Sequence, residues 1–303
     1  MPEPPSMSLI ERAAAVYGLD AVFRPQPVKT PGPALEDAAS PAPPEGVALP
    51  GAEAQASPFA PIVPVSRERL RALGMIVPGA APGALSEEFR IVKRQILLTA
   101  MGSAKAYPGP RGRLILVTSG RSGEGKTFCA ANLALSMTAE TDTEVLLVDA
   151  DVAKPDMPGL FGIAADTGLM DALADPAIDP ETLVVRTDIP GLALLPAGRH
   201  RHDDTELLAS DRSRILLDRL ADAHPRRVVI LDSAPALAAS PASVLALHVG
   251  QILVVVRADE TTESELRETI ALVDSGAEIK LLLNGVTFGA TNRSFGSYYG
   301  TAP

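Results

Sequence analysis

The sequence predicts an α/β fold in which a parallel sheet is covered by helices on both faces. Two observations carry this prediction. Short runs of branched apolar residues recur from residue 114 onward without polar alternation, which is typical of strands buried on both faces. Longer amphipathic runs separate them, and strands that alternate with helices imply right-handed crossovers and parallel pairing. The predicted strands are residues 114–117, 145–148, 193–195, 228–231, 252–256 and 280–283, and the helices between them are residues 130–139, 207–223, 240–247 and 263–275.

The chain has 303 residues, and its composition divides it into three parts. Residues 1–66 are rich in Pro and Ala and lack apolar periodicity, so we expect a disordered linker. Within it, residues 8–17 begin with a Ser cap, which favours either a short docking helix or a transient helix in a tail. Residues 67–290 are expected to form the folded domain, and residues 291–303 a flexible tail that carries two tyrosines.

Charge and cysteine content exclude several classes of protein. The formal net charge is −10, which argues against a sequence-independent grip on nucleic acid. Cys129 is the single cysteine, so a disulfide framework is excluded and a reducing cytosol is expected. No apolar run approaches the roughly 20 residues of a membrane span. Any membrane association is therefore expected to be peripheral and to come through a partner.

A glycine-rich segment follows the first predicted strand. Gly120, Gly125, Lys126 and Thr127 have the spacing G-x-x-x-x-G-K-T, and a helical run follows. Glycines let the backbone curl tightly and aim several N–H groups at a phosphate, while the lysine supplies a cation and the threonine hydroxyl reaches Mg²⁺. A glycine-rich turn without a ligand is the alternative, but the flanking strand and helix are the context that the motif requires. The segment predicts a nucleotide-binding protein of the P-loop type.

Carboxylates follow two of the predicted strands. Asp149 and Asp151 come where the strand at 145–148 ends, and Asp232 follows the strand at 228–231. In parallel sheets these ends face the ligand, where a carboxylate can hold Mg²⁺ and its waters or accept a proton from a nucleophile. Each Asp alone could simply cap the next turn, but three of them beside a phosphate loop favour a site.

A helix is also predicted at residues 86–97, before the first strand, with Ser86 as its cap. Glu87, Arg90 and Lys93 recur every three positions and so lie near one another along one side. Spacing alone leaves a solvated charged face and a contact surface equally open. The residues expected on the buried sides are Phe89, Ile91, Val92, Ile96 and Leu97.

In their order and spacing, these motifs resemble those of the bacterial tyrosine kinases, relatives of the MinD and ParA ATPases. The phosphate loop ending in GEGKT, the strand LLVDAD followed by a basic residue and proline, and VVILDSAP look like the Walker A, Walker A′ and Walker B motifs. GLMDALAD, LLPAGRH, ELLAS and LLLNGV fit the same family. More narrowly, MSLIERAAAVYG, RLRALGMIVPG and SEEFRIVKRQIL are similar to cytoplasmic tyrosine autokinases associated with exosortase-type exopolysaccharide loci.

The resemblance implies a kinase that uses ATP and Mg²⁺ to phosphorylate tail tyrosines of neighbouring copies and thereby regulates exopolysaccharide synthesis or export. Asp149 would be the base for the acceptor phenol, while Thr127, Asp151 and Asp232 would arrange the metal. Together with Lys126, the three acids form the expected catalytic set. The residues expected to contact the nucleotide are Gly120, Ser122, Gly123, Glu124, Gly125, Lys126, Thr127, Phe128 and Asn284, the last at a position that resembles an adenine-reading residue.

The same resemblance implies partners. Glu87, Arg90 and Lys93 match an E-x-x-R-x-x-R motif that packs subunits into a ring, so a homo-oligomer is expected. Tyr298 and Tyr299 would be the phosphate acceptors. A membrane polysaccharide co-polymerase, a chain-length determinant protein, is expected to bind and activate the chain at the inner membrane.

The chain departs from the family pattern at several positions. Ala234 stands where the family has the first proline of Asp-Ser/Thr-Pro-Pro, and Lys154 stands where it has arginine. Lys93 replaces the last arginine of the helix motif and so forfeits a planar, bidentate fork. The tail holds only two tyrosines, where many relatives have a longer cluster, and this pair could instead be a docking peptide.

An alternative function is a nucleotide switch of the MinD and ParA type, which hydrolyses ATP to control assembly at a membrane. Such switches carry an extra lysine five residues before the Walker lysine, and here Arg121 holds that place. The loop as a whole is closer to the kinase version, which we favour.

Overall fold

The computed structural model describes residues 61–102 and 111–286. The expected docking helix at residues 8–17 lies outside this part of the chain, as do Tyr298 and Tyr299.

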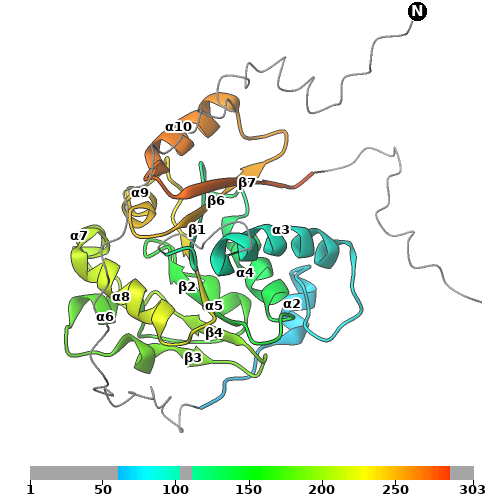
Figure 1. Cartoon of the computed structure of the whole chain (residues 1–303), viewed down its shortest axis with the longest axis horizontal. Helices are drawn as coiled ribbons and strands as arrows, with labels where there is room; N and C mark the ends of the chain where they lie inside the picture. The colour runs from blue at the N-terminus through cyan, green and yellow to red at the C-terminus, as the bar shows by residue number, and fades with distance from the viewer. Residues whose placement is uncertain (1–60, 103–110, 287–303) are drawn as a thin grey trace, which may run out of the picture. The chain divides into compact units, whose positions relative to one another are not determined.

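Seven strands of the described residues form one sheet in the order β3-β4-β2-β5-β1-β6-β7 (Figure 1). All neighbouring strands are parallel except β3 and β4, which are antiparallel. The six predicted strands are confirmed, and β3 is an additional strand, too short for a sequence pattern to reveal. The strands are β1 Leu114–Ser119, β2 Glu144–Ala150, β3 Val185–Arg186, β4 Leu192–Leu195, β5 Arg227–Ser233, β6 Gln251–Arg257 and β7 Glu278–Asn284.

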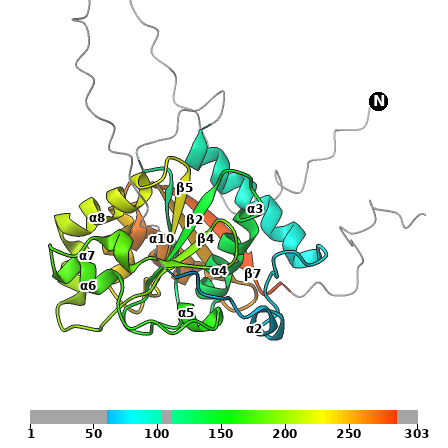
Figure 2. The ribbon, with the colours of Figure 1, turned by 90° about the horizontal axis from the view of Figure 1, so that it is seen from below.

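Helices cover both faces of the sheet, as predicted, and Figure 2 shows the strands between the two groups. Because successive side chains of a strand point to opposite faces, each central strand contributes to two cores. Ile115 and Val117 of β1 belong to one core, and Leu114 and Leu116 to the other. The first core is covered by α2 Arg67–Ala72, α3 Ala84–Met101, α4 Lys126–Met137 and α5 Met157–Leu160, and the second by α6 Leu169–Ala174, α7 Asp204–Ala209, α8 Asp211–Asp222, α9 Pro241–Ala246 and α10 Glu263–Val273.

Helix α4, which follows the glycine-rich loop, is the most deeply buried helix of the first core. Its residues from Cys129 to Met137 are all buried, because alanines and a serine let the helix lie close to the strands. Burial raises the pKa of the Cys129 thiol to about 12, with a further contribution from the charge of Asp232, so this cysteine stays protonated and unreactive. None of the helices in residues 61–102 and 111–286 combines the length and the apolar character needed to cross a bilayer.

Two helix predictions need correction. The predicted helix at residues 207–223 is two helices, α7 and α8, because Ser210 adopts an extended backbone between them (φ −73°, ψ 156°). The Ser210 hydroxyl accepts a hydrogen bond from Ser213 N and so caps the start of α8. Helix α3 begins at Ala84 with Gly83 as its N-cap, so Ser86 lies inside the first turn and is not the cap.

The prediction that β7 is buried on both faces was wrong. β7 is the last strand in the sheet order of the described residues, and its Leu281 and Leu283 are 53% and 59% exposed. A continuous apolar run therefore does not distinguish this end strand from a central one.

Residues 61–66, which the sequence analysis assigned to the linker, contact the folded domain. Val63 N donates to Arg186 O at 2.8 Å, Val65 N donates to Asp188 Oδ1 at 2.8 Å, and Ser66 N donates to Phe161 O at 2.9 Å. The folded part of the chain thus extends upstream of residue 67.

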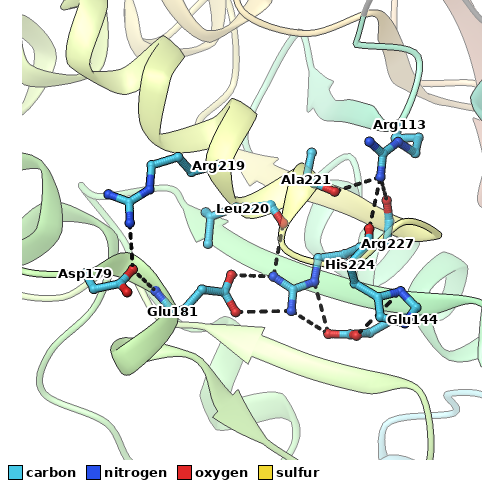
Figure 3. A network of polar contacts seen from close by, with 9 residues as sticks. All are labelled: Arg113, Glu144, Asp179, Glu181, Arg219, Leu220, Ala221, His224 and Arg227. Carbon is cyan, nitrogen blue, oxygen red and sulfur yellow. Dashed lines mark hydrogen bonds and ion pairs between the residues drawn. The ribbon is translucent and has the colours of Figure 1, made fainter. Parts of the chain in front are cut away.

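A buried arginine links several elements at the amino ends of the strands, the end of the sheet opposite the glycine-rich loop. Arg227, the first residue of β5, lies between the carboxylates of Glu144 on β2 and Glu181 on the 3₁₀ helix η2, Pro180–Leu183 (Figure 3). Its guanidinium is 2.7 Å from Glu144 Oε1 and donates to Leu220 O at 3.0 Å. Because the Arg227 side chain is only 5% exposed, these contacts replace the water that its charge would otherwise need.

Candidate active site

The phosphate loop connects the end of β1 to the start of α4. Gly123 and Gly125 have φ angles of 90° and 95°, a left-handed backbone conformation that residues with a Cβ rarely adopt. Gly125 is the N-cap of α4, and Lys126 is the first helical residue. The loop thus brings free backbone N–H groups and the positive end of a helix to one place, which suits an anion.

Three carboxylates lie beside this loop, as the sequence predicted. Asp149 of β2 and Asp232 of β5 are register partners on neighbouring strands, and β5 in turn pairs with β1, which leads into the loop. Asp151 follows β2 and is buried, and its Oδ2 is 2.9 Å from Lys126 Nζ. The strand order therefore gathers a cation and three acids from separate parts of the chain.

Asp149 is held in place by backbone groups. Its Oδ1 accepts from Asp151 N at 3.3 Å, and its Oδ2 accepts from Met157 N at 3.2 Å. Burial raises the pKa of Asp149 to about 8, and the charge of Asp232 adds to this rise against the opposing effect of the two N–H groups. A carboxyl group with such a pKa can take up and release a proton near neutral pH.

Asp232 and Lys126 have opposite charges in the same buried region. Burial raises the pKa of Asp232 to about 7, although the charge of Lys126 and the hydroxyl of Thr127 oppose the rise. Burial alone would lower the pKa of Lys126, but the charges of Asp232, Asp151 and Asp156 together raise it. Lys126 is therefore a permanent cation, while the ionisation of Asp232 depends on what binds next to it.

The donor set fits a magnesium ion that is held largely by water and phosphate. Asp232 Oδ1 is buried and has no hydrogen-bond partner among the described residues, so it can accept from a metal-bound water. In the same residues, no group of three or more His, Cys, Asp or Glu side chains is placed to hold a metal by itself. Mg²⁺ commonly keeps several waters and takes only one or two carboxylates besides substrate phosphates.

A cavity of about 470 Å³ opens beside Asp149. Its walls come from α5 with the chain around it and from the segment after β4, and they include Pro155, Ile163, Ala197 and Gly198. Small and apolar residues share the lining with four charged ones, Arg69, Asp149, Asp156 and Asp166. A lining that is both apolar and charged suits an aromatic ring with a polar tip.

Asn284, at the end of β7, lies against the phosphate loop. Its Nδ2 donates to Glu124 O at 2.9 Å, and a Cβ added at Gly125 would come within 2.2 Å of this nitrogen. Asn284 thus lies beside the phosphate loop, while its adenine-reading role stays a prediction. Phe128, in the first turn of α4, packs its ring partly against the first core.

Glu87, Arg90 and Lys93 of α3 line one groove but differ in exposure to solvent. Glu87 and Arg90 pair with each other at 2.5 Å on the surface. Lys93 is only 8% exposed, and its Nζ donates to Ser136 O at 3.0 Å and pairs with a carboxylate oxygen of Glu140 at 2.7 Å. In the same helix Ile91, which was expected to be buried, is exposed. The sequence spacing therefore placed Glu87, Arg90 and Lys93 on one side of α3 correctly, but it did not predict the burial of Lys93 and wrongly placed Ile91 on a buried side.

Sequence reasoning missed the contribution of the chain between β6 and α10. Thr261 donates its hydroxyl hydrogen to Glu124 Oε1, and Arg121 forms an ion pair with Glu265 at 2.9 Å. Thr262 and Glu265 form a capping box that starts α10, a sequence signal that the helix prediction at residues 263–275 did not use. Nothing in the local pattern indicated that it touches the phosphate loop.

The fold and this site define the class of P-loop nucleotide-binding proteins, with the loop and the acids together at the carboxyl ends of parallel strands. Comparison with known proteins narrows the class. The family profile described as "ParA: NUBPL iron-transfer P-loop NTPase" matches residues 112–185. The kinase domain of the Escherichia coli tyrosine kinase ETK is 30% identical, with a TM-score of 0.59 over 70% of this chain and 80% of that domain. The chain belongs to the bacterial tyrosine-kinase family.

Two further relatives agree with this assignment. EpsB of Ralstonia nicotianae, assigned as a tyrosine-protein kinase, is 36% identical over 194 residues, which are 62% of this chain and 25% of EpsB. The BceF tyrosine kinase domain superimposes with a TM-score of 0.59 and 28% identity over 76% of this chain and 94% of that domain. The chain spans about a quarter of the length of the curated relatives it matches.

Proposed function

We propose that this chain is an ATP-dependent protein-tyrosine autokinase that phosphorylates tail tyrosines of neighbouring copies and so regulates exopolysaccharide synthesis or export. The observation that carries the proposal is the position of Asp149, a buried carboxyl with a raised pKa that pairs in register with Asp232 and lines a cavity of about 470 Å³. The tyrosine-kinase names of the relatives support the same activity.

In the proposed reaction the phenol oxygen of Tyr298 or Tyr299 attacks the γ-phosphorus of ATP. The bond between the γ-phosphorus and the bridging oxygen breaks, ADP leaves, and the phenol proton passes to Asp149. Lys126 contributes a fixed positive charge beside the phosphates. Catalysis then rests mainly on positioning and on charge neutralisation, which is typical of phosphoryl transfer.

Magnesium, when bound, would neutralise the β- and γ-oxygens. The residues that would hold it are Thr127 through its hydroxyl and Asp151 and Asp232 through their carboxylates. The buried, unpartnered Oδ1 of Asp232 supports this role. The nucleotide contacts themselves are proposed for Gly120, Ser122, Gly123, Glu124 through its backbone N–H, Gly125, Lys126, Thr127 and Phe128, with Asn284 near the base.

The kinase is favoured over a MinD- or ParA-like ATPase switch by the position of Arg121. In a switch, a cation at this place would serve a partner's nucleotide. Here the guanidinium of Arg121 pairs at 2.9 Å with Glu265 of the same chain. This ion pair lies at the surface, where the Arg121 side chain is 66% exposed, so the preference for the kinase rests also on the tyrosine-kinase relatives.

We further propose that copies assemble through the surface of α3 that carries Glu87 and Arg90. A groove of about 380 Å³ beside these residues, lined in part by Val77 and Ile189, could receive a neighbouring subunit. Lys93 would support this surface indirectly by fixing α3 against α4. A membrane polysaccharide co-polymerase is the proposed activating partner that brings the chain to the inner membrane.

The experiment is incubation of the purified full chain with ATP and Mg²⁺, followed by intact-mass and peptide mass spectrometry. Phosphate is expected on Tyr298 or Tyr299, and it should be absent in Lys126→Met. The double variant Tyr298→Phe with Tyr299→Phe is the matched control, because it keeps the site and removes the acceptors. Release of inorganic phosphate without any phosphotyrosine would contradict the kinase proposal and support the ATPase switch instead.

A further inference from the structure

Glu124 lies within the phosphate loop but is turned into the protein. It is only 4% exposed, and both of its carboxylate oxygens accept hydrogen bonds from the chain itself. Oε2 accepts from Arg121 N at 2.8 Å, across the loop, and Oε1 accepts from the hydroxyl of Thr261. The side chain therefore joins the loop to the connection between β6 and α10, residues 258–262.

The Thr261 hydroxyl has a fixed direction in this contact. Its oxygen accepts from Arg257 N at 2.9 Å, so its hydrogen is free to point toward Glu124. Asp259 between them has a φ of 61°, the left-handed conformation that a tight turn imposes on a residue with a side chain. The conformation of the turn that holds Thr261 is thus set by contacts within the β6–α10 connection itself, independently of the phosphate loop.

The loop also touches its neighbours through its glycines. A Cβ at Gly120 would come within 2.8 Å of Thr269 Oγ1 on α10, and Asn284 contacts the loop on the side of Gly125. Besides the Glu124 contacts, the phosphate loop therefore packs closely against α10 at Gly120 and against β7 at Gly125.

We propose that Glu124 is a positioning residue that sets nucleotide affinity by clamping the phosphate loop to Thr261. Its carboxylate does not act as a ligand of the nucleotide or the metal, because protein donors already use both oxygens, and only its backbone N–H remains for the phosphates. Its negative charge would repel a polyphosphate, and the two hydrogen bonds turn that charge away from the loop's interior. The inference rests on the proposed nucleotide site and adds a segment outside the Walker motifs to it.

The test is the affinity of the full chain for Mg-ADP, measured by calorimetry for five variants. Glu124→Ala and Thr261→Val each remove the clamp and are expected to weaken binding about tenfold, because the loop must then be ordered on binding. The double variant is expected to lose little more than either single variant, since both remove one shared contact. Glu124→Gln should bind within about twofold of the native chain or more tightly, because its amide can still accept from Arg121 N and donate to Thr261 Oγ1. Glu263→Ala is the matched control, since Glu263 lies in the first turn of α10 and pairs only with exposed Arg267 in the described structure.

The outcomes separate this inference from the function on which it rests. Binding by the native chain together with unchanged binding by Thr261→Val would overturn the clamp, and Thr261→Val is mild enough to fold. Equal losses in Glu124→Gln and Glu124→Ala would overturn it too, because they would assign a direct ligand role to the carboxylate. Additive losses in the double variant would show that the two residues act separately. If the native chain itself fails to bind Mg-ADP, the proposed nucleotide site fails, and this inference fails with it.

Discussion

Asp149 of β2 lies opposite Asp232 of β5 in the register of two parallel strands, and both side chains are buried. Two carboxylates so placed cannot both ionise without cost, and burial adds to that cost. The pKa of Asp149 rises from 3.8 to about 8 and that of Asp232 from 3.8 to about 7. The protein thus keeps protons in its site that the unfolded chain would release.

This relationship predicts how stability depends on pH. Below the unfolded pKa, Asp149 is protonated in both states and has no effect. As the pH rises, the unfolded chain loses this proton first, so Asp149 destabilises the fold progressively until its folded pKa, about 8, is passed. In Asp149→Asn this penalty is absent. Relative to the native chain, the free energy of unfolding of the variant should therefore increase, meaning a more stable fold, by at least about 2 kcal/mol between about pH 5 and about pH 8.5. Urea unfolding without metal or nucleotide measures it, and a pH-independent difference would contradict the raised pKa.

The same residue predicts the pH dependence of phosphoryl transfer. If Asp149 accepts the phenol proton, kcat/KM should rise between about pH 6.5 and about pH 8.5 as the carboxylate forms. Asp149→Asn should lower kcat by about 10²- to 10⁴-fold while Mg-ADP affinity changes by less than about threefold. Rates of phosphotyrosine formation and calorimetry give the two quantities. Retention of most of kcat in this variant would exclude Asp149 as the base.

Lys93 and Arg90 of α3 should behave differently on substitution. Lys93→Met removes a buried ammonium from Ser136 O and Glu140 and should lower the free energy of unfolding by about 1–2 kcal/mol. Arg90→Ala removes only a surface pair with Glu87, so stability should change by less than about 0.5 kcal/mol. If α3 packs subunits together, Arg90→Ala should instead weaken self-association in analytical ultracentrifugation. An unchanged oligomer distribution would remove Arg90 from the proposed interface.

The network around Arg227 should affect stability without affecting the site (Figure 3). Arg227→Met leaves Glu144 and Glu181 without their shared cation and should lower the free energy of unfolding by about 2–3 kcal/mol. Arg219→Ala is the control: it breaks an exposed pair with Asp179, 3.3 Å apart, and should change stability by less than about 0.5 kcal/mol. Mg-ADP affinity should stay within about twofold in both variants, because the network lies at the amino ends of the strands and the site at their carboxyl ends. Loss of Mg-ADP affinity in Arg227→Met but not in Arg219→Ala would contradict this prediction, because it would show that the Arg227 network affects the nucleotide site.

The sequence predicted those features that depend on local pattern. Continuous apolar runs located six strands, because strands buried on both faces need apolar residues at every position; β7 carries such a run although it is exposed. The spacing from Gly120 to Thr127 located the phosphate loop, because its curled backbone tolerates few residues other than glycine. The position of Asp149, Asp151 and Asp232 at strand ends followed from the same reading, since parallel strands end at a common edge.

Tertiary structure alone decided which residues meet. Glu124 and Thr261 are 137 residues apart, and their contact depends on β6 lying next to β1, which no local pattern records. The burial of Lys93 depends on how α3 packs on α4, and the exposure of Leu281 and Leu283 on the place of β7 at the end of the sheet order. Residue type and spacing fix the conformation of a segment because the forces involved act over a few residues. The neighbours of that segment are set by the order in which strands pair, and that order is a property of the whole chain.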